Sequence, residues 1–164
     1  MIIRETQKIE IASKPQNIKK VEEFIDEICD YFNVNNDYFG NIIVAVTEAV
    51  FNAIKHGNKN DESKKVIVAF ELIKGCVTFT VTDEGVGFNP NSVLDPTDPE
   101  NENEELGRGL YLMKSLSDEL EYSNNGTTVQ MRFAVSSIHK ELANRRIRAY
   151  QDFVLGKTVK QEKK

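Results

Sequence analysis

The chain has 164 residues, 40% of them hydrophobic and 29% charged, a composition typical of one soluble globular domain with a proper core. No apolar run is long enough to cross a bilayer, and the first eleven residues, MIIRETQKIEI, carry charges where a signal peptide needs its apolar stretch. These features predict a cytoplasmic protein with no membrane partner.

The formal net charge of -5 is unevenly distributed along the chain. Residues 136–164 contain eight of the 21 basic residues and three of the 26 acidic ones, so the rest of the chain is strongly acidic. An acidic body argues against direct binding of nucleic acid, because neutralising phosphates requires a basic surface. The basic end is compatible with an anionic partner, and also with a solvated helix that binds nothing.

The first third of the chain predicts one strand and two helices. Residues 2–11 suit a strand, and Pro15 suits the first turn of the helix that follows. A second helix is expected over 37–55, with Gly57 as its C-terminal stop. The first helix is recognised by apolar residues at helical spacing, namely Ile18, Val21, Phe24, Ile25, Ile28 and Phe32.

The middle of the chain predicts a hairpin followed by a long loop. Two alternating apolar segments, 64–74 and 76–83, meet at Lys74-Gly75 and suit two antiparallel strands. Residues 88–106 then contain three of the four prolines and many acids. A loop of this length in a small domain is usually a functional lid or a disordered segment.

The remainder predicts a helix, a second hairpin and a last helix. The first of these helices starts at the glycines of GRGLYLMKSLSDEL, and Asn125-Gly126 suits the hairpin turn. The last helix is expected over 137–155. This order predicts an α+β fold, a two-layer sandwich with a mixed, mainly antiparallel sheet and helices on one face. We expect one main domain over 1–136 and a helical extension with a charged tail over 137–164.

The segment TEAVFNAIKHGNK places a carboxylate and an amide on one helix face. Glu48 and Asn52 are four residues apart, and Lys55 and His56 continue toward the helix end. An amide oxygen can ligate a hard cation such as magnesium, and a carboxylate can accept a proton from an attacking hydroxyl. By itself this pattern equally describes an amphipathic helix whose polar stripe faces water.

The segment TDEGVGF places an acid at a strand end and two glycines directly after it. Glycine permits a positive φ and lets the backbone approach a ligand closely, which suits Gly85 and Gly87. A buried Asp83 would need a donor, and the exocyclic amine of adenine is one. The same letters also suit an ordinary turn.

Two weaker signals follow. Gly107 and Gly109 precede an apolar helix and flank Arg108, so free backbone amides and one guanidinium could bind phosphate there. The Thr128 hydroxyl, at the start of a late strand, could bond a base edge directly or through water. Each signal alone is also explained by a helix start or a hairpin turn.

Taken in order, the four segments resemble the GHKL ATP-binding superfamily over roughly residues 10–135. The superfamily includes gyrase-type topoisomerases, mismatch-repair ATPases, histidine kinases and anti-sigma serine kinases. The helix with Glu48 and Asn52 resembles its N box, and residues 83–87 resemble its first glycine box. The segment GRGL, residues 107–110, resembles the second glycine box, and residues 126–128 resemble the last one. In size and N box, the small anti-sigma factor kinases are most similar.

The resemblance implies a bound ATP with magnesium and a role for each matched residue. Glu48 would be the general base, Asn52 the magnesium ligand, and Asp83 the residue that binds adenine. The other implied nucleotide-binding residues are Lys55, Gly85, Gly87, Gly107, Arg108, Gly109, Leu110 and Thr128. Lys55 stands where histidine kinases often have a phosphate-contacting lysine, whereas many anti-sigma kinases have an apolar residue there.

The resemblance further implies an anti-sigma factor that sequesters a sigma factor and phosphorylates a serine of an anti-anti-sigma protein. It also suggests a homodimer. Two alternatives stay open. One is a regulatory binding module without catalysis, and the other is a free-standing ATP-binding domain of the histidine kinase type. The latter would need an acceptor histidine, and only His56 and His139 are present.

Overall fold

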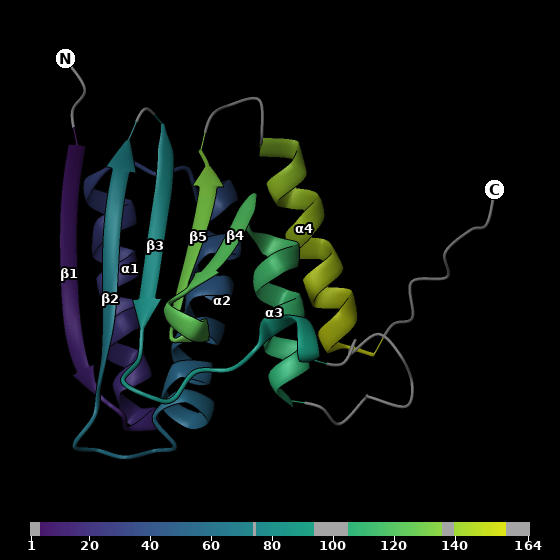
Figure 1. Cartoon of the computed structure of the whole chain (residues 1–164). Coiled ribbons are helices and arrows are strands. Elements are labelled where there is room, and N and C mark those ends of the chain that lie inside the picture. The colour runs from purple at the N-terminus through teal and green to yellow at the C-terminus, as the bar shows by residue number, and fades with distance from the viewer. Residues whose placement is uncertain (1–3, 74, 94–104, 136–139, 157–164) are drawn as a thin grey trace.

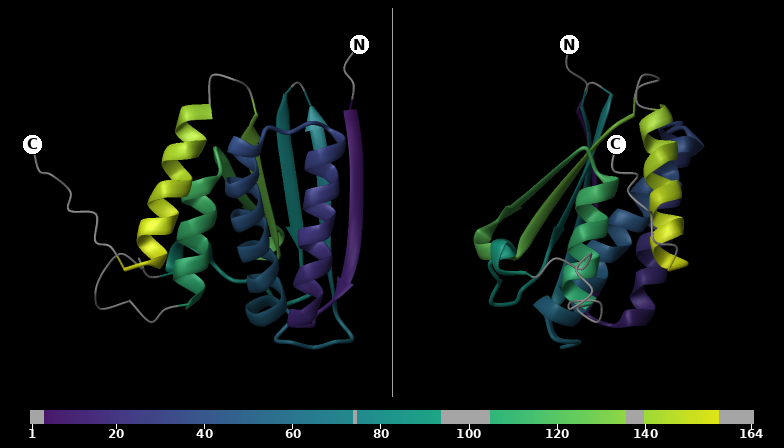
Figure 2. Two further views of the ribbon diagram at one scale, coloured as in Figure 1. Left: turned by 180° about the vertical axis from the view of Figure 1, so that it is seen from behind. Right: turned by 90° about the vertical axis from the view of Figure 1, so that its right-hand side faces the viewer.

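The structure, a computed structural model, describes residues 4–73, 75–93, 105–135 and 140–156. Within these ranges, five strands form one sheet and the four α-helices all lie on one face of it (Figures 1 and 2). The expected α+β sandwich is confirmed. Among the described helices, none is long and apolar enough to cross a membrane.

The sheet has the strand order β1-β2-β3-β5-β4. Neighbouring strands in the described residues are all antiparallel, so the parallel pair that a mixed sheet allows does not occur among them. Both expected hairpins are present, with Gly75 at a φ of 76° in the first turn and Gly126 at 84° in the second. The strands are β1 (Arg4–Ala12), β2 (Lys65–Ile73), β3 (Cys76–Thr82), β4 (Glu119–Ser123) and β5 (Thr128–Ala134).

The core lies between the sheet and the helices. Side chains alternate between the two faces of a strand, so every second residue points at the helix layer. Phe70, Phe79 and Met131 are directly opposite one another across three strands and are fully buried. The alternating apolar segments of the sequence therefore correspond to the inner face of the sheet.

Helices α1 (Ile18–Tyr31) and α2 (Asn36–Asn52) pack against the inner face. Pro15 begins a short 3-10 turn just before α1, a position that its fixed φ favours. The Asn35 side chain caps α2 by accepting a hydrogen bond from the Asp37 amide at 3.0 Å. The buried side of α1 consists of Val21, Phe24, Ile25, Ile28 and Cys29.

The end of α2 differs from the expectation. The α-helix ends at Asn52 and continues as a π-helical turn, Ala53–Gly57. The sequence predicts Gly57 as a helix stop of the left-handed kind, but its φ is not positive. The reason for a glycine at this position is a close tertiary contact, described below.

The remaining helices are α3 (Glu105–Leu116) and α4 (Lys140–Val154). In the described residues α3 begins at Glu105, so Gly107 and Gly109 lie inside the helix rather than ahead of it. α4 packs against α2 and α3 (Figure 2). Most of the predicted lid, residues 94–104, lies outside the described residues, and the segment before it contains a short 3-10 turn, Pro90–Ser92.

Candidate nucleotide site

A cavity of about 220 Å³ lies between the helix layer and the end of the sheet where β3 finishes and β5 begins. Its wall is mainly apolar, with a few polar groups, as in most small-molecule sites. Four predicted site residues line it, namely Asn52, Asp83, Gly87 and Leu110. The other lining residues are Ala49, Ala53, His56, Gly57, Val81, Phe88, Leu106, Met113, Tyr122, Gly126, Thr127 and Val129.

Glu48 and Asn52 lie together on α2, as their spacing predicts, and both face Gly109 of α3. A β-carbon built on Gly109 would lie 2.8 Å from Asn52 Nδ2 and 3.2 Å from Glu48 Oε2. Because Gly109 has no side chain, α3 can approach α2 this closely. Gly109 thus contacts the two polar residues of α2. Its amide, on the fifth residue of the described helix, is not among the four left free at a helix start.

On this face of α2 the Asn52 amide is buried and Glu48 is partly buried. Burial raises the pKa of Glu48; Arg108 opposes this shift and Glu105 adds to it. Both side-chain atoms of the Asn52 amide are buried, with no hydrogen-bond partner among the described residues. Leaving a buried polar atom unpaired costs about 1–3 kcal/mol. Asn52 is therefore a group that a ligand could satisfy.

Lys55 and His56 are neighbours in the π-helical turn, but their side chains have different surroundings. Lys55 forms an ion pair with Glu105 at the start of α3, and its Nζ lies 5.5 Å from the centre of the Phe51 ring. His56 lines the cavity. Its Nε2 is buried without a hydrogen-bond partner in the described part of the chain. Burial lowers the pKa of His56, an effect that Glu105 opposes and Lys55 reinforces.

Asp83 directly follows β3, and its main chain and side chain are both held in place. Its amide donates to the Thr127 carbonyl at 2.9 Å, and its Oδ1 accepts from the Gly85 amide at 2.8 Å. Burial raises the pKa of Asp83, and the Gly85 bond and Lys64 both act against this shift. A β-carbon on Gly85 would lie 2.2 Å from the Gly57 carbonyl oxygen, so only glycine fits there.

The turn after Asp83 interlocks with the β4–β5 turn. Gly87 has a φ of 80°, and a β-carbon on it would lie 1.9 Å from the Asn125 carbonyl oxygen. The Phe88 amide donates to that same oxygen at 3.0 Å. The rings of Phe88 and Tyr122 then meet edge to face at 5.6 Å and form one side of the cavity.

The threonine that lines the cavity is Thr127, one residue before the predicted Thr128. Thr128 is paired with Thr82 across the sheet, and their hydroxyl oxygens are 3.4 Å apart. The Thr128 hydroxyl also accepts a hydrogen bond from Asn124 at 3.1 Å. The hydroxyl of Thr128 is thus engaged on the strand pair.

The first turn of α3 borders the cavity. Leu106 and Leu110 line it, Gly107 is buried, and Arg108 is exposed. The amides of the first four residues of an α-helix have no intrahelical partner. An anion could therefore be bound at the start of α3, beside the cavity.

Asn58 is a supporting residue that the sequence did not single out. It is 1% exposed, and its Oδ1 accepts from the Glu84 amide at 2.8 Å. Its Nδ2 donates to the Ser13 hydroxyl at 2.9 Å and to the Lys65 carbonyl at 3.0 Å. Asn58 thereby ties the segment after Asp83 to β2 and to the segment before α1. The residues His56-Gly57-Asn58 are typical of an ordinary turn, so the sequence alone does not mark Asn58 as a buried structural residue.

Comparison with known proteins agrees with this geometry. The family model described as histidine kinase-like ATPase domain matches residues 11–133. The chain belongs to this family of ATP-binding domains, which confirms the resemblance inferred from the four segments.

Two curated relatives carry the name serine-protein kinase RsbW. The one from Bacillus licheniformis is 31% identical over 126 residues, which cover 73% of this chain and 79% of the relative. The one from Staphylococcus epidermidis is 34% identical over 96 residues, which cover 54% of this chain and 60% of the relative. The match thus spans less than two thirds of the latter protein.

A solved structure shows the same fold. It contains the RsbU and RsbW domains of a protein from Mycobacterium tuberculosis, and its TM-score to this chain is 0.58 at 19% identity. The similar region covers 80% of this chain and 32% of that one.

Proposed function

We propose that the protein is an ATP-dependent serine kinase whose nucleotide lies in the cavity between α2, α3 and the sheet. The observation that carries the proposal is the meeting of Asn52, Asp83 and Leu110 around one cavity, although they are far apart in sequence. The names of the curated relatives support the kinase assignment.

Asp83 would bind the base. A half-buried carboxylate needs donors, and the Gly85 amide supplies one of them. The exocyclic amine of adenine would supply another from inside the cavity. Gly87 keeps that part of the wall free of a side chain, while Val81 and Val129 provide an apolar surface for the purine ring.

The start of α3 would bind the phosphates. Backbone amides at a helix start and the Arg108 guanidinium are suited to phosphate oxygens, and by the family resemblance Gly107 would lie beside them. Lys55 would join them after leaving Glu105. The unpaired Asn52 Oδ1 is a hard oxygen donor that fits magnesium, so Asn52 would hold the metal. Magnesium, when bound with the nucleotide, supplies positive charge that neutralises the phosphates.

Glu48 would act as the general base. Its raised pKa moves this carboxylate toward the pH at which it can take a proton efficiently. The serine oxygen of the substrate protein attacks the γ-phosphorus and its proton passes to Glu48. The bond from the γ-phosphorus to the bridging oxygen breaks, and ADP leaves with that oxygen. The chain contributes mainly positioning and charge, as in other phosphoryl transfers.

The substrate would be an anti-anti-sigma protein, and the sequestered partner a sigma factor in the cytoplasm. These partners, and a homodimer as the working form, rest on the resemblance to anti-sigma serine kinases. The relatives' printed name supports the serine as acceptor.

A second candidate is a binding module without catalysis. The contact of Glu48 and Asn52 with Gly109 favours it, because both side chains already lie against α3. The histidine kinase-type alternative would need an acceptor histidine that reaches the nucleotide of another domain, and His56 lies in the cavity wall itself.

The test is a transfer assay. The protein is incubated with magnesium, γ-labelled ATP and a candidate anti-anti-sigma protein, and the substrate is examined for phosphoserine by mass spectrometry. We expect transfer by the wild type and a loss of about 10²- to 10⁴-fold in Glu48→Gln with nucleotide binding retained. Binding of both ligands without any transfer by the wild type would favour the module. Undiminished transfer by Glu48→Gln would remove Glu48 from the mechanism.

A further inference from the structure

Helix α4 lies beyond residues 11–133, the part of the chain that matches the family model, yet it packs closely on the domain. One side of α4 makes the contacts. Arg146, Ile147, Tyr150 and Phe153 follow one another at helical spacing and each meets the domain. α4 is thus held through the part of the helix from Arg146 to Phe153.

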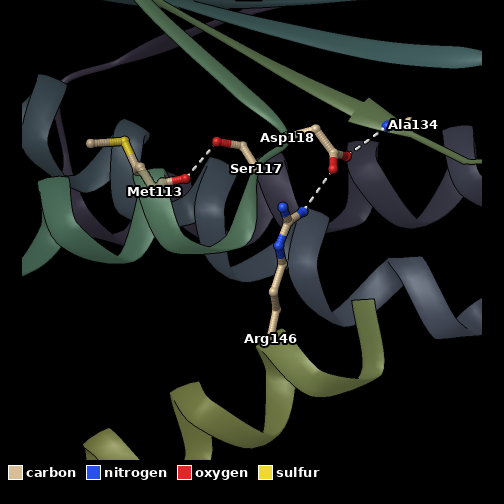
Figure 3. Close-up of polar contacts among 5 residues, drawn as sticks. All are labelled: Met113, Ser117, Asp118, Ala134 and Arg146. Carbon is tan, nitrogen blue, oxygen red and sulfur yellow. Dashed lines mark hydrogen bonds and ion pairs between the residues drawn. The ribbon is translucent and has the colours of Figure 1, made fainter. Parts of the chain in front are cut away.

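The first contact is an ion pair at the far end of α3 (Figure 3). Arg146 Nη1 lies 2.9 Å from Asp118 Oδ1, and about a fifth of each side chain is exposed. Asp118 Oδ2 accepts a hydrogen bond from the Ala134 amide at 2.8 Å, which completes a link from α4 to the end of β5. Removal of Arg146 would leave Asp118 with a single partner in this link.

The second contact is a notch in α2. A β-carbon on Gly40 would lie 3.2 Å from Ile147 Cδ1, so the glycine leaves just enough space for the isoleucine side chain. Tyr150, one turn further along α4, packs against the hydrophobic core.

The third contact reaches toward the nucleotide site. The rings of Phe153 and Tyr111 lie 5.5 Å apart. From Arg146 to Phe153 the chain advances seven residues along α4, while the partners go back seven residues, from Asp118 to Tyr111. α4 therefore runs antiparallel to α3, and its C-terminal end lies level with the middle of α3, about one turn from the candidate phosphate-binding residues Gly107 and Arg108.

Tyr111 occupies the side of α3 that faces away from the cavity. Its neighbour Leu110 lines the cavity, whereas Tyr111 faces Phe153. Gly107 and Arg108 come one helical turn before Tyr111, and their backbone amides point along the helix axis, so the orientation of α3 at Tyr111 also sets the direction of these amides. α3 thus lies between the cavity and α4.

We propose that α4 positions the first turn of α3 for phosphate binding, with Phe153 as the positioning residue. The inference rests on the proposed nucleotide site. Phe153 touches no reacting group and acts through Tyr111. A ring pair of this kind changes an equilibrium by about two- to tenfold.

The experiment compares Phe153→Ala with Val154→Ala in the full chain. Val154 is the next residue and is 59% exposed, so its truncation is a matched control. Calorimetry gives Kd for magnesium-ATP and for adenosine. We expect Phe153→Ala to weaken ATP about fivefold, with adenosine changed less than twofold, and Val154→Ala to change neither. An unchanged ATP affinity, or equal losses for both ligands, would overturn the inference.

A second measurement does not depend on nucleotide. Hydrogen exchange in the free protein should be faster at the amides of residues 109–112 in Phe153→Ala than in Val154→Ala. Equal exchange in the two variants would overturn the inference even if ATP binds as proposed. Failure of the wild type to bind ATP, with the exchange difference present, would reject the nucleotide site and keep the role of α4 in ordering α3. If Phe153→Ala does not fold, Phe153→Leu, which keeps an apolar side chain without the ring, takes its place with the same expected results.

Discussion

Gly57 and Asp83 are so close that a β-carbon on Gly57 would lie 2.6 Å from the Asp83 carboxyl carbon. The two residues come from the end of α2 and the end of β3, and their contact brings the helix layer to the candidate base-binding carboxylate. The carboxylate keeps its orientation because Gly57 has no side chain to displace it and because the Gly85 amide donates a hydrogen bond to its Oδ1.

Replacement of Gly57 by alanine should disturb base binding. The added methyl group overlaps the Asp83 carboxylate, and overpacking of this kind costs about 1–3 kcal/mol. We expect Gly57→Ala to raise the Kd for ATP about tenfold or more in a fluorescence or calorimetric titration. Glu62→Ala, at an exposed loop position, serves as control. Wild-type affinity in Gly57→Ala would contradict the assigned position of the base.

Replacement of Asp83 by asparagine should weaken binding of the purine. Asparagine keeps an oxygen for the Gly85 amide but has no negative charge for the exocyclic amine, and a charged hydrogen bond contributes about 1.5–3 kcal/mol. The expected result is a Kd for ATP about ten- to hundredfold higher, measured by calorimetry beside the wild type. Equal affinities in the two proteins would reject Asp83 as the base-binding residue.

The buried position of Glu48 should make stability depend on pH. Burial raises the pKa of Glu48 in the folded state above its unfolded value, so the folded state holds the proton more tightly. The stability gained from protonation is complete below the unfolded pKa and is lost as the pH rises through the folded pKa. Glu48→Gln removes that loss and should be more stable than the wild type at pH 8.

Urea unfolding at pH 5 and pH 8 checks this pH dependence. From pH 5 to pH 8, the wild type should lose more unfolding free energy, or gain less, than Glu48→Gln does. Other titrating groups are common to both proteins, so the comparison isolates Glu48. A variant that is less stable than the wild type at pH 8 would show that the ionised carboxylate stabilises the fold.

Replacement of Asn58 by alanine should destabilise the fold. The substitution leaves the Glu84 amide without its acceptor, at a cost of about 1–3 kcal/mol, and removes the bond to the Ser13 hydroxyl, which keeps its own bond to the Lys64 carbonyl. Urea denaturation should show this loss, and Glu62→Ala should show a change below about 1 kcal/mol. A loss in Asn58→Ala no larger than in that control would mean that the network contributes little.

The sequence predicted the parts of the fold that depend on local periodicity. The inner face of the sheet follows from alternation, and the shared side of Glu48 and Asn52 follows from their spacing of four. Close approaches between distant segments have no local signature. In the sequence, Gly57 suits a helix end and Gly109 a helix start. In the structure, Gly57 is required by the close approach of Asp83, and Gly109 by that of Asn52. The sequence also cannot distinguish Thr127 from Thr128, the threonine expected at the base, because the packing of the turn decides which of the two lines the cavity.

The most direct test of the account is a calorimetric titration of the wild-type protein with ATP in the presence of magnesium, repeated with Asp83→Asn and with Asn52→Ala. The account predicts saturable binding of one nucleotide per chain, weakened by each substitution, because base and metal belong to one cavity. Absence of binding heat in the wild type across temperatures, or binding that neither substitution changes, would contradict it.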